Sequence, residues 1–315
     1  MLSRRHLRSK ALQALYAYFQ SDNNNIAAGE KELTHSIDKV YDLYLFQLSL
    51  LPELVDYAVI KMEEAKLKRL PSPDDINPNM RFINNRVIEK LRINRNLRRA
   101  LDTKKINWVS EQEFTKQIFS LIRETPEYVE YLNNPEDSFE NDQLYISKLY
   151  KKYISEAEDL ESYFEEKSIY WSDDWDLVSS TIIKTIKSFK ESSDDFHPIS
   201  PLYKDEEDDR DFVMNLFRKT IFNNQQFEDI IADKTKNWEV DRIALIDILI
   251  LKMAMAEVIN FPSIPVKVTL NEYIDISKRF STPKSKTFVN GVLDKIIFDL
   301  KRDGKIQKTG RGLIE

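Results

Sequence analysis

The chain has 315 residues, a formal net charge of −6, no cysteine and only five glycines. Without cysteine, disulfides and thiolate metal sites are excluded, and a reducing compartment such as the cytoplasm is favoured. Nucleotide-binding loops need closely spaced glycines, which the sequence lacks, so P-loop and dinucleotide-binding folds are excluded as well. Low glycine content with many helix-forming residues favours an all-α protein, and the length is sufficient for a large core.

The sequence predicts neither a membrane span nor a signal peptide. Its most apolar stretch, residues 243–251, contains Asp247 and is far shorter than the ~20 apolar residues that a span needs. The basic N-terminus, residues 4–8, is not followed by the apolar block of a signal peptide. We therefore expect a cytoplasmic protein that does not bind membranes.

Helical periodicity predicts the first elements in chain order. A helix is expected over residues 4–20, and the polar run at 21–25 ends it. Residues 31–70 are expected to form two helices, the second of which Pro52 begins or kinks. The three prolines in residues 71–78 predict a linker.

Two blocks of like charge follow the linker. Residues 81–105 carry nine basic side chains against two acidic ones, whereas residues 127–174 carry fourteen acids against four lysines. Such blocks are usually solvated faces of helices. A docking of the two blocks onto each other is the alternative.

A second boundary is expected at residues 192–211, which are rich in serine, proline and acidic side chains. Four helices are predicted after it: 212–227, with a possible bend at Asn223 and Asn224; 238–258, apolar on nearly all sides and so a buried central helix; 267–280; and a last one capped by Thr282 with Pro283 as its first residue. No strand pattern is present.

The sequence gives little support to catalysis. Three scattered histidines and the absence of cysteine leave no helical pair of metal ligands and no thiol nucleophile. Acidic residues are too numerous for their presence to indicate a catalytic pair. We expect a non-enzymatic protein without metal, cofactor or small-molecule substrate.

The first candidate site is the opening helix. Arg4, Arg5 and Arg8 cluster on its first turns, and Tyr16 follows Arg5 by eleven residues, close to three helical turns. Arg5 and Tyr16 therefore share a side of the helix, where a guanidinium can bind phosphate and a ring can stack on a base. The alternative is a solvated basic terminus with Tyr16 packed in the core.

The second candidate site is residues 281–291. Lys284, Ser285 and Lys286 stand at a helix start, where free backbone N–H groups and the helix dipole attract anions. Capping alone would explain the hydroxyl groups. Phe288 and Gly291 are expected to serve helix packing, Gly291 by letting another helix come close.

Four segments of the chain resemble the NusB family. Residues 4–16 (RRHLRSKALQALY) resemble its arginine-rich opening, and residues 247–258 (DILILKMAMAEV) resemble its central helix. Residues 264–278 and 288–295 resemble its two most specific motifs. His6 and Leu7 thin out the arginine run, and Lys252 stands where arginine is usual.

The resemblance implies a NusB-like helical bundle that binds boxA-like single-stranded RNA. It also implies a heterodimer with NusE, the ribosomal protein S ten, and a role in the elongation complex that transcribes ribosomal RNA. By position it assigns these RNA contacts: Arg4, Arg5, Arg8, Gln13, Tyr16, Lys286, Phe288 and Asn290.

The predicted domains follow from the extent of the resemblance. Residues 1–22 and 205–302 are expected to form the RNA-binding core, residues 23–204 a helical insertion of unknown role, and residues 303–315 a flexible basic tail. The alternative function is a helical protein-docking module, or a ribosome-biogenesis adaptor, that has lost RNA binding. The acidic block could also cover the basic first helix. An RNA methyltransferase with a NusB-like domain is excluded, since no glycine-rich cofactor domain is present.

Overall fold

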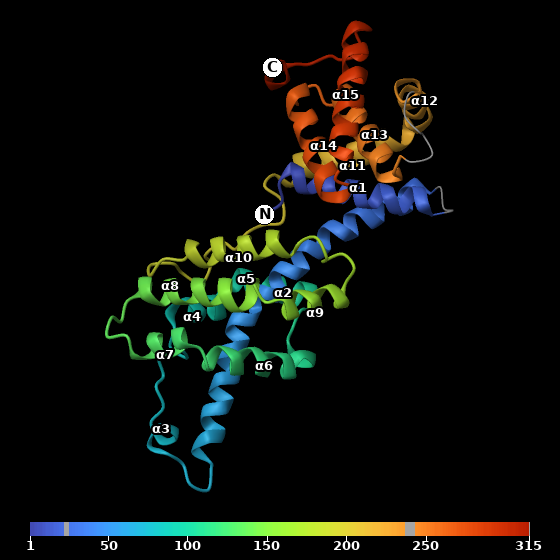
Figure 1. The fold of residues 1–315 in the computed structure, drawn as a ribbon. Coiled ribbons are helices and arrows are strands. Elements are labelled where there is room, and N and C mark those ends of the chain that lie inside the picture. Colours follow the sequence, from blue (N-terminus) through green and yellow to red (C-terminus); the bar gives the residue numbers. More distant parts are fainter. Residues whose placement is uncertain (22–24, 237–242, 315) are drawn as a thin grey trace. The chain divides into compact units, whose positions relative to one another are not determined.

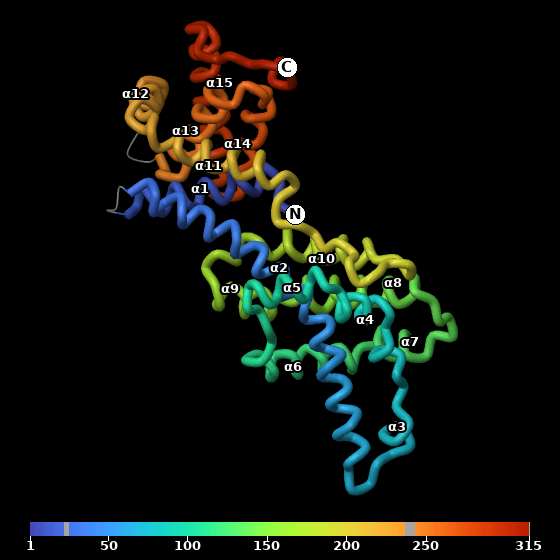
Figure 2. Tube along the Cα trace, turned by 180° about the vertical axis from the view of Figure 1, so that it is seen from behind, coloured from blue at the N-terminus to red at the C-terminus, as the bar shows by residue number. Residues whose placement is uncertain are grey.

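The computed structural model describes residues 1–21, 25–236 and 243–314, and these contain helices but no strand (Figure 1). The prediction of an all-α protein is confirmed. The chain divides into two compact units, which Figure 2 shows from behind. Unit 1 comprises residues 1–37 and 203–315, and unit 2 comprises residues 38–202.

Unit 1 is built around the helix α13, which packs against every other complete helix of the unit. All residues from Leu249 to Val258 are buried, which confirms the prediction of a central helix. The start predicted at residue 238 lies outside the described residues. The helices of unit 1 are α1 (Arg4–Gln20), the beginning of α2 (Ile26–Lys66), α11 (Glu206–Phe222), α12 (Asn224–Lys234), α13 (Leu245–Asn260), α14 (Val266–Phe280) and α15 (Ser285–Arg302).

Two predicted helices of unit 1 need correction. The helix predicted over residues 212–227, with a bend at Asn223 and Asn224, is two helices, because α11 ends at Phe222 and α12 begins at Asn224. The last helix begins at Ser285 instead of Pro283, since the backbone N–H of Ser285 closes a turn with the carbonyl of Thr282 at 2.9 Å. Helix α14 agrees with its predicted bounds within one residue.

Helix α2 is one helix of 41 residues with Pro52 inside it, so the prediction of two helices is wrong. Proline removes a backbone hydrogen bond and costs a helix interior ~3 kcal/mol. Leu50, Leu51 and Leu54 around it are fully buried. Burial of this apolar face outweighs the cost of the proline.

By length and composition, α2 is apolar enough to cross a membrane, which the sequence analysis did not recognise. However, 67% of its most apolar window is buried inside the protein. A core helix of a globular protein passes the same test, so this is weak evidence for a membrane span.

Unit 2 contains the rest of α2 and a set of shorter helices around it. Figures 1 and 2 show α8 and α10 side by side, and they are in contact. Phe164 packs against Trp171 and Trp175 in an aromatic core. The helices are α3 (Pro73–Ile76), α4 (Arg86–Ile93), α5 (Arg95–Lys104), α6 (Gln112–Arg123), α7 (Pro126–Asn133), α8 (Phe139–Tyr150), α9 (Glu158–Lys167) and α10 (Trp175–Ser188).

The two charged blocks dock onto each other in part. Arg86 Nε donates to Asp142 Oδ2 at 2.9 Å, and Asp137 also pairs with Arg86. Arg81 donates to the backbone carbonyls of Asn134 and Glu136. Docking of the two charged blocks onto each other is therefore confirmed for the beginning of the basic block. The basic residues of α5 that form ion pairs do so with carboxylates outside the acidic block.

The C-terminal residues run back onto the loop between α13 and α14. Lys308 Nζ donates to the carbonyl of Phe261 at 3.0 Å, and the N–H of Thr309 donates to the carbonyl of Pro262 at 3.0 Å. A Cβ at Gly312 would lie 1.9 Å from the Pro262 oxygen, so only glycine fits. These contacts differ from the predicted flexible tail.

Candidate functional site

One face of α1 is exposed at both ends and partly covered between them. Arg5 and Tyr16 are exposed, Tyr16 by 43%, and Ser9 and Gln13 between them are half-buried. These residues follow one another at intervals of three or four, which places them in one stripe. Tyr16 lies on the surface as the spacing from Arg5 predicted, and not in the core.

Arg8 points into the protein, so the sequence-based expectation of an RNA contact at Arg8 needs correction. Its Nε and Nη2 donate to the two carboxylate oxygens of Glu257 at 2.7 and 2.8 Å, and its side chain is only 4% exposed. Glu257 also accepts from Thr269 Oγ1 at 2.8 Å and from the Tyr273 hydroxyl at 3.1 Å. This buried bidentate ion pair, with its hydrogen bonds to Thr269 and Tyr273, connects α1, α13 and α14 inside the protein.

The burial of this network also fixes its protonation. Burial, followed by the charge of Glu257, raises the pKa of the Tyr273 phenol well above its ordinary value. Tyr273 therefore stays a neutral donor to Glu257 at every physiological pH. No proton transfer is expected from this cluster.

Arg4 and Arg5 remain accessible but are paired with acidic residues. Arg4 Nη2 lies 2.6 Å from Asp208 Oδ2. Arg5 donates to both oxygens of Glu272, at 2.8 and 3.0 Å, and its side chain is 53% exposed. An anionic ligand would have to compete with these carboxylates.

The start of α15 divides into exposed and buried residues. Lys284, Lys286 and Asn290 are exposed, whereas Ser285 and Phe288 are buried. Among the residues that the structure describes, neither lysine lies within ion-pair distance of a carboxylate. These two ammonium groups are therefore available to an anion.

Two residues of this segment have internal roles. Ser285 Oγ donates to Asp247 Oδ2 at 2.7 Å, which ties the start of α15 to α13. Phe288 is 7% exposed and belongs to the core, which agrees with the expectation that it serves helix packing and not with an RNA contact. The expectation that Gly291 lets another helix come close is wrong, because a Cβ added at Gly291 would have no atom within 4 Å.

The acidic residue Asp275 links the two candidate segments. Lys278, bonded to Asp275 at 2.6 Å, and then the charges of Arg5 and Lys286 hold its pKa below the ordinary value. Arg5 Nη2 lies 3.3 Å from this carboxylate. The carboxylate that pairs with Arg5 of α1 thus also feels the charge of Lys286 on α15, although the two cations are far apart in the sequence.

The sequence analysis missed the acidic members of this surface, Glu272 and Asp275. Glu272 lay within a recognised motif, but nothing in the sequence indicated that it would pair with Arg5. Lys252, which stands where arginine is usual in the family, also bonds within the protein: its ammonium donates to Asn224 and Glu228 at 2.6 Å each.

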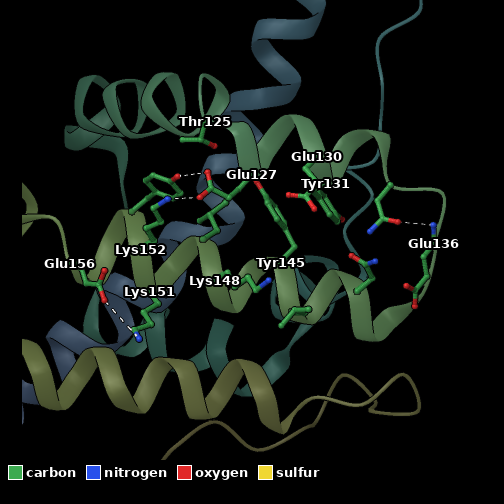
Figure 3. A pocket seen from close by; sticks show the side chains of 15 residues that line it. Thr125, Glu127, Glu130, Tyr131, Glu136, Tyr145, Lys148, Lys151, Lys152 and Glu156 are labelled. Carbon is green, nitrogen blue, oxygen red and sulfur yellow. Dashed lines mark hydrogen bonds and ion pairs between the residues drawn. The ribbon is translucent and has the colours of Figure 1, made fainter.

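Unit 2 contains a cavity of about 530 Å³ beside α7 and α8 (Figure 3). Tyr131 and Tyr145 stack in its wall with their ring centres 3.8 Å apart. Bonds from Lys152 and Tyr153 lower the pKa of Glu127 to about 2, so this carboxylate is a poor proton acceptor at neutral pH. In the described ranges no three His, Cys, Asp or Glu side chains could hold a metal ion. Nothing in this cavity assigns a reaction to it.

Comparison with known proteins gives one family. The model of the NusB family matches residues 174–298. The transcription antitermination protein NusB of Salinibacter ruber is 50% identical over 105 residues, which is 33% of this chain and 66% of that protein. The protein of the same name from Chloroherpeton thalassium is 41% identical over 106 residues, 34% of this chain and 50% of that protein.

A third relative, the transcription antitermination protein NusB of Natranaerobius thermophilus, is 32% identical over 91 residues, 29% of this chain and 66% of that protein. The chain thus spans between 50% and 66% of the length of these relatives. No solved structure matches the chain. The family match begins at residue 174 and includes α10, inside the segment predicted as an insertion.

Proposed function

Because the chain belongs to the NusB family, we propose that it is a non-catalytic, cytoplasmic transcription antitermination factor that binds boxA-like single-stranded RNA. It acts together with NusE, the ribosomal protein S ten, in the elongation complex that transcribes ribosomal RNA. Its RNA surface consists of the open face of α1 with Arg5, Gln13 and Tyr16, and the start of α15 with Lys284, Lys286 and Asn290.

The observation that carries this proposal is that Arg5 lies 3.3 Å from Asp275, the carboxylate whose pKa the charge of Lys286 also lowers. Exposed cations stand on both segments, and α1 also carries the exposed ring of Tyr16. Single-stranded RNA is held by this combination, because phosphates pair with the cations while a base stacks on the ring. The buried Arg8, Ser285 and Phe288 act as positioning residues for this surface.

Binding requires an exchange of partners at Arg5. A phosphate oxygen replaces Glu272 as the acceptor of the guanidinium, and this exchange keeps the bidentate geometry. The freed carboxylate of Glu272 is only 16% exposed, and it keeps the charge of Arg8, whose Nη1 lies 3.5 Å from it. Lys284 and Lys286 need no such exchange, so they provide the larger net attraction.

A protein-docking module that has lost RNA binding is the second candidate. The observation in its favour is that none of the three arginines of α1 is without a carboxylate: Asp208 pairs with Arg4, Glu272 with Arg5 and Glu257 with Arg8. A pull-down from lysate with and without ribonuclease separates the two candidates. If partner proteins are still captured after ribonuclease treatment, the result supports the protein-docking module.

The test is a titration of fluorescent boxA-like RNA by anisotropy, with and without NusE, against a scrambled RNA. The variant Arg5→Ala/Lys284→Ala/Lys286→Ala removes three cations, so the log-log salt slope of binding becomes shallower by about 2. Tyr16→Leu weakens binding by about tenfold at unchanged slope, because it removes only stacking.

Lys295→Ala is the matched control, since this exposed lysine lies further along α15. It should leave affinity for boxA-like RNA unchanged. An unchanged salt slope in the triple variant would count against this surface. Absence of RNA binding in the wild-type protein, with or without NusE, would move the function to protein docking.

A further inference from the structure

The junction of α4 and α5 in unit 2 holds the segment 193–197 by its backbone. Four donors from this junction bind four successive or nearly successive carbonyls, so the path of the segment is fixed. The bonds are Lys90 Nζ to Ser193 at 2.6 Å, Arg95 N–H to Asp195 at 2.7 Å, Asn96 Nδ2 to Phe196 at 2.8 Å and Asn94 Nδ2 to His197 at 2.8 Å.

This clamp keeps an aromatic ring in solvent. Phe196 is 56% exposed, although burying a phenylalanine side chain is worth ~1.5–3 kcal/mol. The guanidinium of Arg95 lies over the ring, 4.9 Å from its centre. A rigid, exposed ring beside a cation is a preformed contact surface, because little order has to be gained on binding.

Basic side chains of α5 lie close to Arg95, whereas Asp194 and Asp195 precede Phe196 in the chain. Arg99 lies one turn after Arg95 on α5, and Arg98 is adjacent; both are exposed. In the described part of the chain neither Arg98 nor Arg99 lies within ion-pair distance of a carboxylate. Arg95 does pair with Asp195 at 2.6 Å, so Arg98 and Arg99 provide the uncompensated charge.

We propose that Phe196, Arg95, Arg98 and Arg99 form a second contact for single-stranded RNA. The inference rests on the proposed function, and it adds a binding surface outside the α1 and α15 segments. A base stacks on the Phe196 ring, and the backbone phosphates on either side of that base pair with the guanidinium groups. The surface therefore contacts RNA beyond the boxA-like sequence and has no base preference.

An acidic protein segment is the competing ligand for such a basic surface. It would use the arginines but would gain little from a clamped, solvent-exposed ring. Nucleic acid uses both, because every base has a face that stacks. The ring is thus the feature that favours RNA, and its removal separates the two ligands.

The test compares two RNAs on the full-length protein, one of about 10 nucleotides with boxA alone and one of about 30 nucleotides with single-stranded flanks. Phe196→Ala is expected to weaken binding of the longer RNA about tenfold and leave the shorter one unchanged. Arg99→Ala should make the salt slope for the longer RNA shallower by about 0.7. Phe196→Tyr keeps the ring and should bind as the wild-type protein does.

Matched controls are Phe298→Ala and Arg123→Ala, which remove an exposed ring and an exposed arginine elsewhere. They should bind both RNAs normally. If the wild-type protein binds RNA and Phe196→Ala binds the longer RNA equally well, the second contact is refuted while the proposed function stands.

Two further outcomes also decide. The first uses polyglutamate as a competitor of the longer RNA. If Arg99→Ala weakens both the binding of the longer RNA and its displacement by polyglutamate, while Phe196→Ala changes neither, the surface binds an acidic segment and the inference is wrong. If the wild-type protein binds neither RNA, both the proposed function and the second contact are wrong.

Discussion

Two arginine-rich helices of this protein use their charge in opposite ways. On α1, Arg8 is buried and bound to Glu257, which stands 249 positions later in the chain. On α5, Arg98 and Arg99 remain in solvent next to a clamped ring. A run of basic residues therefore does not by itself define a binding surface. The packing around the helix decides whether an arginine is part of the interior or open to a ligand.

The difference follows from how much of each helix is covered. Helix α1 packs against both α11 and α13, and seven of its residues are buried, including Arg8 and Lys10. In α5 only Leu97 is buried. A helix covered on two sides takes some of its charged side chains inside with it, and each then needs a partner.

The largest effect is expected from Arg8→Ala. It leaves the carboxylate of Glu257 buried without its main donor, which costs about 3–5 kcal/mol of unit 1 stability. The measurement is hydrogen exchange of the α13 amides, which lie in unit 1. Fluorescence of Trp108, Trp171 and Trp175 would report on unit 2 instead.

The control for this change is the double variant Arg8→Met/Glu257→Gln, which removes both charges and should recover part of the loss. Tryptophan fluorescence of unit 2 should be unchanged in both variants. If Arg8→Ala left the α13 amides fully protected but reduced RNA binding, the side chain would belong to the RNA surface after all.

A smaller effect is expected on lowering the pH, through His6. Burial, and then the charges of Arg279 and Arg5, lower the pKa of His6 to about 4. Its Nδ1 accepts the backbone N–H of Ser3 at 3.2 Å, which caps α1 only while that nitrogen is unprotonated. The unfolded chain takes up this proton near pH 6.5, so the contribution of His6 to stability falls as the pH drops from about 6.5 to 4 and changes no further below that.

The measurement is urea unfolding of unit 1 at pH 7 and at pH 4.5, followed by exchange of the α1 amides. His6→Asn keeps a capping acceptor that does not titrate. The wild-type protein should therefore lose more stability between these two pH values than His6→Asn does. Equal losses in the two proteins would show that His6 does not carry this dependence.

Local patterns in the sequence were sufficient for most of the helices. The periodicity of residues 4–20 and 267–280 gave α1 and α14 almost to the residue, since each has one apolar stripe. They failed at Pro52, and at Asn223 they indicated only a bend where one helix ends and another begins. Pro52 stays inside a helix because buried leucines surround it, whereas α11 ends at Asn223 although no proline or glycine stands there.

The candidate site was predictable only where the helical period alone fixes a side chain. Spacing placed Arg5 and Tyr16 on one face correctly. The burial of Arg8 depends on Glu257, Thr269 and Tyr273, and the position of Lys286 relative to Arg5 depends on the packing of three helices. The clamp around Phe196 joins residues about 100 positions apart, which no local pattern indicates.

The smallest effect is expected from Gly291→Ala, which tests the start of α15 directly. Since an added Cβ meets no atom within 4 Å, alanine should stabilise the helix by about 0.5–1 kcal/mol. Gly304→Ala after the same helix is the control and should destabilise, because Gly304 has a φ of +66°. A loss of stability in Gly291→Ala would contradict the open space seen there. If the variant is more stable but binds boxA-like RNA more weakly, the glycine admits the RNA backbone, which supports the start of α15 as part of the RNA surface.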